Sequence, residues 1–317
     1  MGMIVLTQDM LQSLLSLPYW AYIAAGVGLI VLILVPVLLV RSRKKKKRSA
    51  AKKEIVSGNT ARPPAPIWDF ANLQGIGNRE TQQDAFCLSP IDENTISNKG
   101  IYFVLADGMG GIQDGQYIAQ TTVSETAEML GNMQSEEDFA DVLKGIRTVN
   151  DTIYGTYNEQ GGTTLLACHV FKNRLRFACV GDSNIYLLRD GRLFELSRRQ
   201  EYLFDLYLKA IHNGTAISDA MLDPQRASLT SFIGTKHLEI DATKKPFMLR
   251  PKDALLLCSD GVSDTLTQAQ IASAMRYSPE KCCTQLERQI AEAANAGQDN
   301  YTAIAAVYNG SVGINSY

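Results

Sequence analysis

Four aspartate residues stand directly beside apolar segments of this 317-residue chain, at Asp107, Asp182, Asp260 and Asp299. Asp107 and Asp260 are each followed by glycine, and a single Asp-Gly after a strand is usually only a turn. Four carboxylates at the ends of core strands would repel one another at a common rim unless a cation lay among them. Oxygen ligands of this kind favour Mg²⁺ or Mn²⁺ over zinc.

Cysteine and histidine offer no competing chemistry. The C-x5-R spacing of tyrosine phosphatases occurs twice, at Cys168–Arg174 and Cys282–Arg288. The first cysteine lies within an apolar, strand-like run, and the helix expected at the second carries Glu287, which would repel a phosphate group. We therefore expect buried, reduced thiols. The three histidines show no ligand spacing, which indicates structural or surface positions.

Seven motifs make the chain resemble the metal-dependent Ser/Thr protein phosphatases of type 2C, the PPM family. They are Gly75–Phe86, Phe103–Gly111, Gly161–Thr164, Val180–Gly191, Leu229–Gly234, Leu255–Asp264 and Gln298–Val307. Each motif is short, but together they follow the family order through most of residues 71–308. The N-terminal features described below are typical of a membrane-anchored, bacterial-like member.

The resemblance implies a binuclear Mg²⁺ or Mn²⁺ centre. Asp107 would bridge the two ions, and the carbonyl group of Gly108 would bind one of them. Asp260 and Asp299 would complete the other, and Asp84 would act through bound water. Water activated between the ions would attack phosphorus directly, without a covalent enzyme intermediate.

The same resemblance implies roles for two further residues. Arg79 would hold the phosphate group in a bidentate manner. Asp182 would belong to a third, weaker metal site, with a simple hairpin turn as its alternative reading.

The sequence departs from the family pattern in three places. Gln83 stands where many members carry Glu, which weakens the expected support of one metal. Met109 stands where many animal members carry His, a candidate general acid. Arg198-Arg199-Gln200 replaces an Asp-His pair after the hairpin, and the course of residues 198–228, which we expect to shape substrate access, is not predicted.

The elements that must position these residues alternate between strands and helices. Strands are predicted at 101–106, 164–171, 174–180, 184–189, 192–196, 254–258 and 303–308, and helices at 116–133, 137–157, 200–212 and around 283–294. Strands linked by hairpins favour antiparallel sheets with the helices outside them. With the resemblance, this predicts an α+β fold, a four-layer α-β-β-α sandwich of two antiparallel sheets flanked by helices, preceded by one N-terminal transmembrane helix.

The composition narrows the possible partners. A content of 45% hydrophobic and 20% charged residues excludes wholesale disorder. Residues 1–54 hold nine Lys and Arg against two acidic residues, whereas residues 55–317 hold 22 against 31. An acidic domain without a basic stripe is a poor partner for nucleic acid, and we expect none.

The N-terminal region carries a candidate membrane anchor. Trp20–Val40 is uncharged and would span about 31 Å as a helix, and seven Lys and Arg follow within residues 41–48. This predicts a short extracytoplasmic N-terminus (1–19), a transmembrane helix (20–40), a basic stop-transfer segment and linker (41–66) and a cytoplasmic phosphatase domain (67–317). A cleaved signal peptide is disfavoured, because the leader has no Lys or Arg and no small-residue cleavage site precedes the basic block.

The favoured function is a cell-membrane, single-pass protein phosphatase that hydrolyses phosphoserine and phosphothreonine with two or three Mn²⁺ or Mg²⁺ ions. Its expected partners are phosphorylated Ser/Thr proteins, among them a membrane Ser/Thr kinase or its substrates, and membrane lipid at the basic segment. The alternative is a catalytically idle, phosphoprotein-binding scaffold of the same fold. A receptor whose soluble part only signals is a third reading, for which the 19-residue extracytoplasmic segment is too short.

Overall fold

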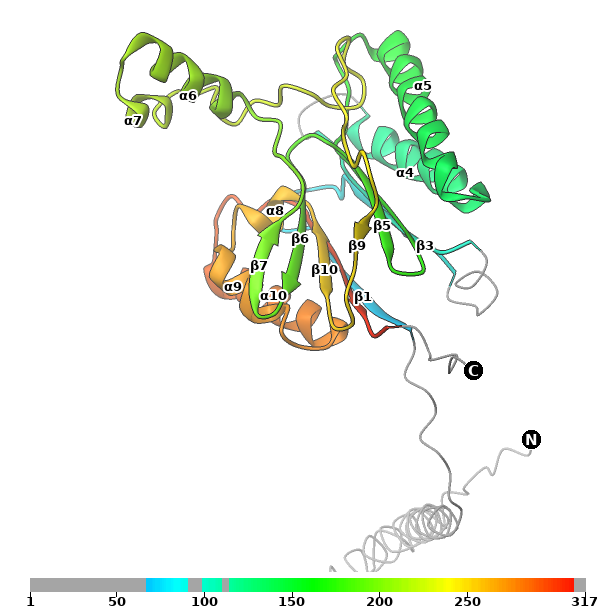
Figure 1. The fold of residues 1–317 in the computed structure, drawn as a ribbon. Helices are drawn as coiled ribbons and strands as arrows, with labels where there is room; N and C mark the ends of the chain where they lie inside the picture. Colours follow the sequence, from blue (N-terminus) through cyan, green and yellow to red (C-terminus); the bar gives the residue numbers. More distant parts are fainter. Residues whose placement is uncertain (1–66, 91–98, 110–113, 311–317) are drawn as a thin grey trace, which may run out of the picture. The chain divides into compact units, whose positions relative to one another are not determined.

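The computed structural model describes residues 67–90, 99–109 and 114–310 (Figure 1). The predicted N-terminus at 1–19, transmembrane helix at 20–40 and linker at 41–66 lie outside these ranges. Within them, no helix has the length and apolar character needed to cross a bilayer. The chain divides into the units Met1–Pro63 and Pro64–Tyr317, and every element described below belongs to the second.

The first sheet has five antiparallel strands in the order β1-β11-β10-β6-β7. These strands are β1 (Trp68–Gly75), β11 (Tyr301–Tyr308), β10 (Ala254–Cys258), β6 (Asn184–Arg189) and β7 (Arg192–Glu195). The hairpin between β6 and β7 turns at Asp190 and Gly191, which both have positive φ angles, as is typical of a two-residue Asp-Gly hairpin turn.

The second sheet is also antiparallel and has the order β2-β3-β4-β5-β8, with β9 paired to another part of β5. Its strands are β2 (Asp84–Leu88), β3 (Ile101–Asp107), β4 (Leu165–Phe171), β5 (Arg174–Val180), β8 (Asp241–Ala242) and β9 (Phe247–Met248). Both faces of this sheet are buried, so its central strands are apolar at nearly every position.

Helices cover the outer face of each sheet (Figure 1). The long helices α4 (Gly115–Asn132) and α5 (Phe139–Tyr157) pack on the second sheet, preceded by the short helix η1 (Glu136–Asp138). The helices α9 (Gln268–Ala274) and α10 (Pro279–Ala293) pack on the first sheet. Three further helices are α6 (Tyr202–Asn213), α7 (Ile217–Ala220) and α8 (Asp260–Ser263).

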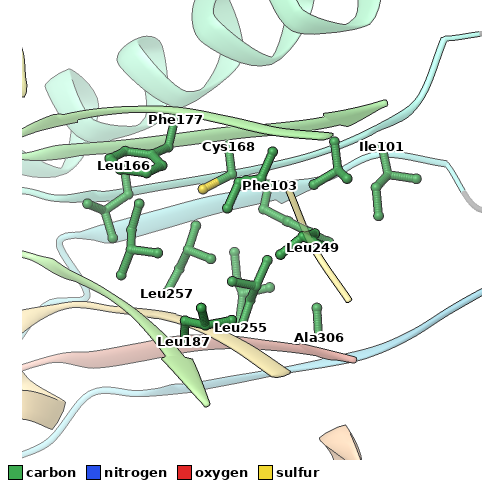
Figure 2. Packing of buried hydrophobic residues seen from close by; sticks show 14 of the residues in the cluster. Ile101, Phe103, Leu166, Cys168, Phe177, Leu187, Leu249, Leu255, Leu257 and Ala306 are labelled. Carbon is green, nitrogen blue, oxygen red and sulfur yellow. The ribbon is translucent and has the colours of Figure 1, made fainter. Parts of the chain in front are cut away.

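The two sheets pack face to face around a shared hydrophobic core (Figure 2). Phe103, Leu166 and Cys168 of the second sheet meet Leu187 and Leu257 of the first, and all five side chains are almost fully buried. Burial of each large side chain contributes about 1.5–3 kcal/mol, so this layer holds the two sheets together. The predicted four-layer order of helix, sheet, sheet and helix is confirmed for the described residues.

Local sequence accounts for where the elements begin and end. Strands β5, β6 and β10 match their predicted bounds because alternation in β5 and apolar runs in β6 and β10 end at clear turn signals. Helix α10 begins earlier than predicted, at Pro279, because proline suits the first helical turn. Strand β11 begins at Tyr301 rather than Ala303, because the polar residues ahead of the apolar run still pair with β1.

Candidate metal centre

The strand registers bring the predicted carboxylates to one rim of the sandwich. Asp84 begins β2 and lies directly opposite Asp107, the last residue of β3. In the first sheet, the last residue of β10, Cys258, pairs with both Asn184 and Ala303. The ends of β6, β10 and β11 therefore coincide, and the segments beside these ends carry Asp182, Asp260 and Asp299.

Ser259 joins the carboxylate-bearing ends of the two sheets. Its hydroxyl group donates a hydrogen bond to Asp84 Oδ2 over 2.9 Å and accepts one from the backbone N–H of Thr302, also over 2.9 Å. Ser259 and Thr302 are fully buried. This contact links β2 to the β10–β11 pair and fixes the position of the Asp84 carboxylate.

Asp107 and Asp84 repel each other in a poorly hydrated place. Burial raises the pKa of Asp107 well above its usual range, and the nearby Asp84, Asp260 and Asp182 raise it further. Burial also raises the pKa of Asp84 to about 6, although the Ser259 hydroxyl works against the rise. Like charges opposed across a strand pair are destabilising, so the arrangement calls for a compensating cation.

The carboxylates of the first sheet show the same pattern. Burial raises the pKa of Asp260, and Asp264 and Asp299 add to this effect. Burial and the charge of Asp260 raise the pKa of Asp182 to about 7, although Arg199 opposes the rise. The rim is thus a set of acidic groups that burial and mutual repulsion make costly to ionise.

Two buried carboxylate oxygens at the rim, Asp84 Oδ1 and Asp260 Oδ1, have no hydrogen-bond partner. In the described part of the chain, no three His, Cys, Asp or Glu side chains are arranged to hold a single ion. Mg²⁺, however, binds through one or two carboxylates and keeps several waters, so it needs no all-protein cage. Unsatisfied oxygens on both sheets therefore fit a pair of hydrated ions that share ligands.

The backbone around Asp107 is fixed by two threonines that the predictions did not single out as site residues. The Asp107 N–H donates to Thr164 Oγ1 over 3.0 Å, and its carbonyl group accepts from Thr163 Oγ1 over 2.8 Å. Gly108 follows in a tight space, where a Cβ atom would lie 2.5 Å from the Gly115 carbonyl oxygen. Backbone packing therefore requires glycine at position 108.

Arg79 lies on the loop between β1 and β2 and reaches the same rim. Its Nη2 atom lies 2.6 Å from Asp299 Oδ2, and the two side chains are 47% and 38% exposed. The predicted phosphate-binding group is therefore adjacent to a predicted metal ligand, and both are open to solvent.

Asn300 holds the loop that carries Arg79. Its side chain accepts a hydrogen bond from the backbone N–H of Gln83 and donates one to the carbonyl group of Ile76, both over 2.8 Å. The residue is buried. These two bonds fix the loop at both ends, a role that sequence reasoning missed because the partners lie more than 200 residues away.

The three departures from the family pattern are now placed. Gln83 lies beside Asp84, and its backbone carbonyl group accepts a hydrogen bond from the backbone N–H of Gly108. Met109 is partly buried, and its backbone N–H donates to Gly162. Arg199 contacts Asp182, and Gln200 bonds to Gly181.

Residues 201–229 form an insertion that contains α6 and α7 and stands apart from the sheets (Figure 1). A bridge between Glu201 and Leu229 closes its base. The predicted helix at 200–212 is observed as α6, with Phe204, Leu208 and Ile211 more than half exposed.

Five of the six cysteines are buried, as the sequence predicted, whereas Cys87 is only partly buried. Cys168, Cys179 and Cys258 are buried within strands, and burial raises the pKa of each thiol. Burial also raises the pKa of Cys282 to about 12, so none of these thiols is an activated nucleophile. His169 is buried in β4, and its Nε2 atom bonds to the carbonyl group of Lys99.

Two antiparallel sheets with helices on both outer sides and a rim of opposed carboxylates define a four-layer sandwich with a candidate site for hard divalent cations. Residues 75–294 match the family model described as protein phosphatase 2C. The chain belongs to the protein phosphatase 2C family.

Relatives and solved structures agree with this assignment. The chain is 29% identical over 224 residues to the Serine/threonine protein phosphatase PstP of Mycobacterium tuberculosis (strain CDC 1551 / Oshkosh), a match that covers 68% of this chain but only 42% of the relative. The crystal structure of the Mycobacterium tuberculosis phosphatase PstP/Ppp has a TM-score of 0.63 and 25% identity, and the match covers 77% of this chain and 99% of that one. A structure of the PstP catalytic domain in complex with two manganese ions has a TM-score of 0.61 at 24% identity, covering 76% of this chain and 98% of that one.

Proposed function

We propose that this chain is a membrane-anchored, Mg²⁺- or Mn²⁺-dependent phosphatase that hydrolyses phosphoserine and phosphothreonine in proteins. The observation that carries the proposal is the rim where Asp84 and Asp107 face each other and Ser259 ties Asp84 to the other sheet. Relatives named Ser/Thr protein phosphatases and a related catalytic domain with two manganese ions support it.

The residues at the rim fit a pair of divalent ions. Asp107 would be the shared ligand, with the carbonyl group of Gly108 on one ion and Asp260 and Asp299 on the other. Asp84 would bind through water, since Ser259 holds one of its oxygens and the other is unpaired. When bound, the ions would neutralise the phosphate dianion and lower the pKa of water, which supplies the nucleophile.

The chain's own residues would bind and orient the substrate. Arg79 would hold the phosphate group at the place where it now contacts Asp299. Asn300 would keep the Arg79 loop in position. Met109 has no titratable proton, so a group other than this side chain, such as water bound at the rim, would protonate the leaving alkoxide.

We also propose a membrane anchor and membrane-associated substrates, which concern residues outside the described ranges. The uncharged segment 20–40 and the basic segment after it would tether the domain to the inner face of the cell membrane. Phosphorylated membrane proteins, including a Ser/Thr kinase or its targets, would then be the accessible substrates. The basic segment would contact anionic lipid.

The proposal is tested by following phosphate release from a phosphothreonine peptide with the purified full chain and Mn²⁺. We expect turnover that EDTA abolishes and that iodoacetamide leaves almost unchanged, because five of the six thiols are buried and burial raises the pKa of all six. Turnover that survives chelation but is lost on alkylation would contradict the proposal. Binding of the peptide without phosphate release would favour the idle scaffold instead.

A further inference from the structure

Arg199 lies among three carboxylates that come from three different segments. Its Nη2 atom lies 2.5 Å from Glu201 Oε1 and 3.8 Å from Asp182 Oδ2, and its Nη1 atom lies 2.7 Å from Asp264 Oδ1. Asp182 lies in the β5–β6 turn, Glu201 begins the insertion, and Asp264 directly follows α8. A single guanidinium group therefore links these three carboxylates at the outer part of the rim.

The guanidinium group is charged and mostly buried, although its partner Asp264 is 56% exposed. The side chains of Arg199, Asp182 and Glu201 are only 26%, 12% and 16% exposed. Burial alone would lower the pKa of Arg199, but the contacts with Asp264, Glu201 and Asp182 raise it above the usual value. A planar, permanently charged fork suits this position better than the point charge of a lysine.

The neighbouring backbone keeps the guanidinium group opposite Asp182. Gln200 accepts a hydrogen bond from the Gly181 N–H through its side chain over 2.7 Å and donates one from its own backbone N–H to the Gly181 carbonyl group over 2.9 Å. The Thr230 N–H bonds to the Gln200 carbonyl group over 2.8 Å. The residues on both sides of the contact between Arg199 and Asp182 are thus fixed.

We propose that the Arg199 guanidinium group takes the place of a third divalent ion at Asp182, so that the centre binds two ions and not three. A divalent ion would need Asp182 oxygen and water ligands at about 2.0–2.1 Å in an octahedral shell. The space next to Asp182 Oδ2 already contains a fixed positive group that would repel such an ion. The inference rests on the proposed function, because it concerns the occupancy of the same centre.

The test is the number of Mn²⁺ ions bound per full chain, measured by calorimetric titration. We expect two ions for the wild type and a third, weaker ion for Arg199→Gln, which removes the charge. Arg199→Lys should keep two ions, because the ammonium group retains the positive charge. Arg198→Gln is the matched control and should also keep two, since Arg198 is exposed and contacts Glu239 outside this cluster.

Variants of Asp182 show whether any additional ion binds at this carboxylate. Asp182→Asn combined with Arg199→Gln should return the count from three to two, and Asp182→Asn alone should leave it at two. A wild type that binds three ions and loses one in Asp182→Asn would overturn the inference, as would a correctly folded Arg199→Gln that stays at two. A wild type that binds no Mn²⁺ would contradict the proposed function itself and the inference with it.

Discussion

The side chains at the rim combine strong repulsion with incomplete hydrogen bonding. Asp84 and Asp107 face each other across β2 and β3, and Ser259 Oγ donates a hydrogen bond to the Asp84 carboxylate. A buried carboxylate with one unsatisfied oxygen is costly unless a cation completes its surroundings. At the scale of single residues, we therefore expect the site to gain stability when divalent ions bind.

Replacing Ser259 should damage both the fold and the centre. Ser259→Ala leaves Asp84 Oδ2 and the Thr302 N–H without their partner, which should cost about 1–3 kcal/mol of unfolding free energy. Loss of a residue that orients a metal ligand should also weaken Mn²⁺ affinity by about 10–100-fold. Denaturant unfolding and calorimetric titration measure the two effects, with the exposed Ser273→Ala as control. Unchanged Mn²⁺ affinity would show that Asp84 does not support the ions.

Without divalent ions, the folded protein should become less stable as the pH rises, because the pKa values of Asp84 and Asp182 are raised in the folded state. The folded state holds protons on Asp84 up to about pH 6 and on Asp182 up to about pH 7, whereas the unfolded chain releases them near the ordinary value of 3.8. The contribution of these groups to stability is thus present at low pH and is lost as the pH rises from about 4 to 7. In EDTA, the melting temperature should fall between pH 5 and 7.5, and saturating Mn²⁺ should remove this fall. An equal fall in Asp84→Asn would assign the effect to other groups.

At the scale of elements, regular strands were predictable and the long-range contacts were not. The bounds of β5, β6 and β10 follow from alternation in β5, apolar runs in β6 and β10, and the turn residues beside them, which are all local signals. The partnership of Ser259 with Asp84 spans 175 residues, and no spacing in the sequence encodes it. The course of the insertion was not predictable either, because Phe204 and Ile211 of α6 are exposed and no core dictates their placement.

The same comparison applies to the candidate site. The positions of these aspartates at one rim follow from their places at or beside strand ends and from the family motifs; they are Asp84, Asp107, Asp182, Asp260 and Asp299. The antiparallel register places them there, but their individual roles as metal ligands stay predictions. The position of Arg199 among the carboxylates had no sequence signal beyond its departure from the family pattern.

The loop that carries Arg79 should depend on Asn300. Asn300→Ala removes the bonds to the Gln83 N–H and the Ile76 carbonyl group, which should cost about 1–3 kcal/mol of stability. Because the loop would no longer hold Arg79 in place, we expect KM for a phosphothreonine peptide to rise several-fold with a smaller change in kcat. Steady-state kinetics measure this, with the exposed Asn213→Ala as control. An unchanged KM would contradict a role for Asn300 in positioning Arg79 for substrate binding.

At the scale of the whole molecule, the acidic domain follows a basic segment and an apolar stretch of 21 residues. We expect the full chain to fractionate with membranes. Its phosphatase domain should resist protease added to intact cells and should be cleaved once the cells are opened. Degradation of the domain in intact cells would place it on the outer side and contradict the proposed orientation.

The central claim is that the opposed carboxylates hold the ions that drive phosphate hydrolysis, and Asp107 tests it most directly. The measurement is phosphate release from a phosphothreonine peptide in saturating Mn²⁺ by the wild type and by Asp107→Asn. We predict that the variant stays folded, because it loses a repelled charge, and that its turnover falls by about a hundredfold or more. A folded Asp107→Asn that hydrolyses the peptide at the wild-type rate would contradict the account.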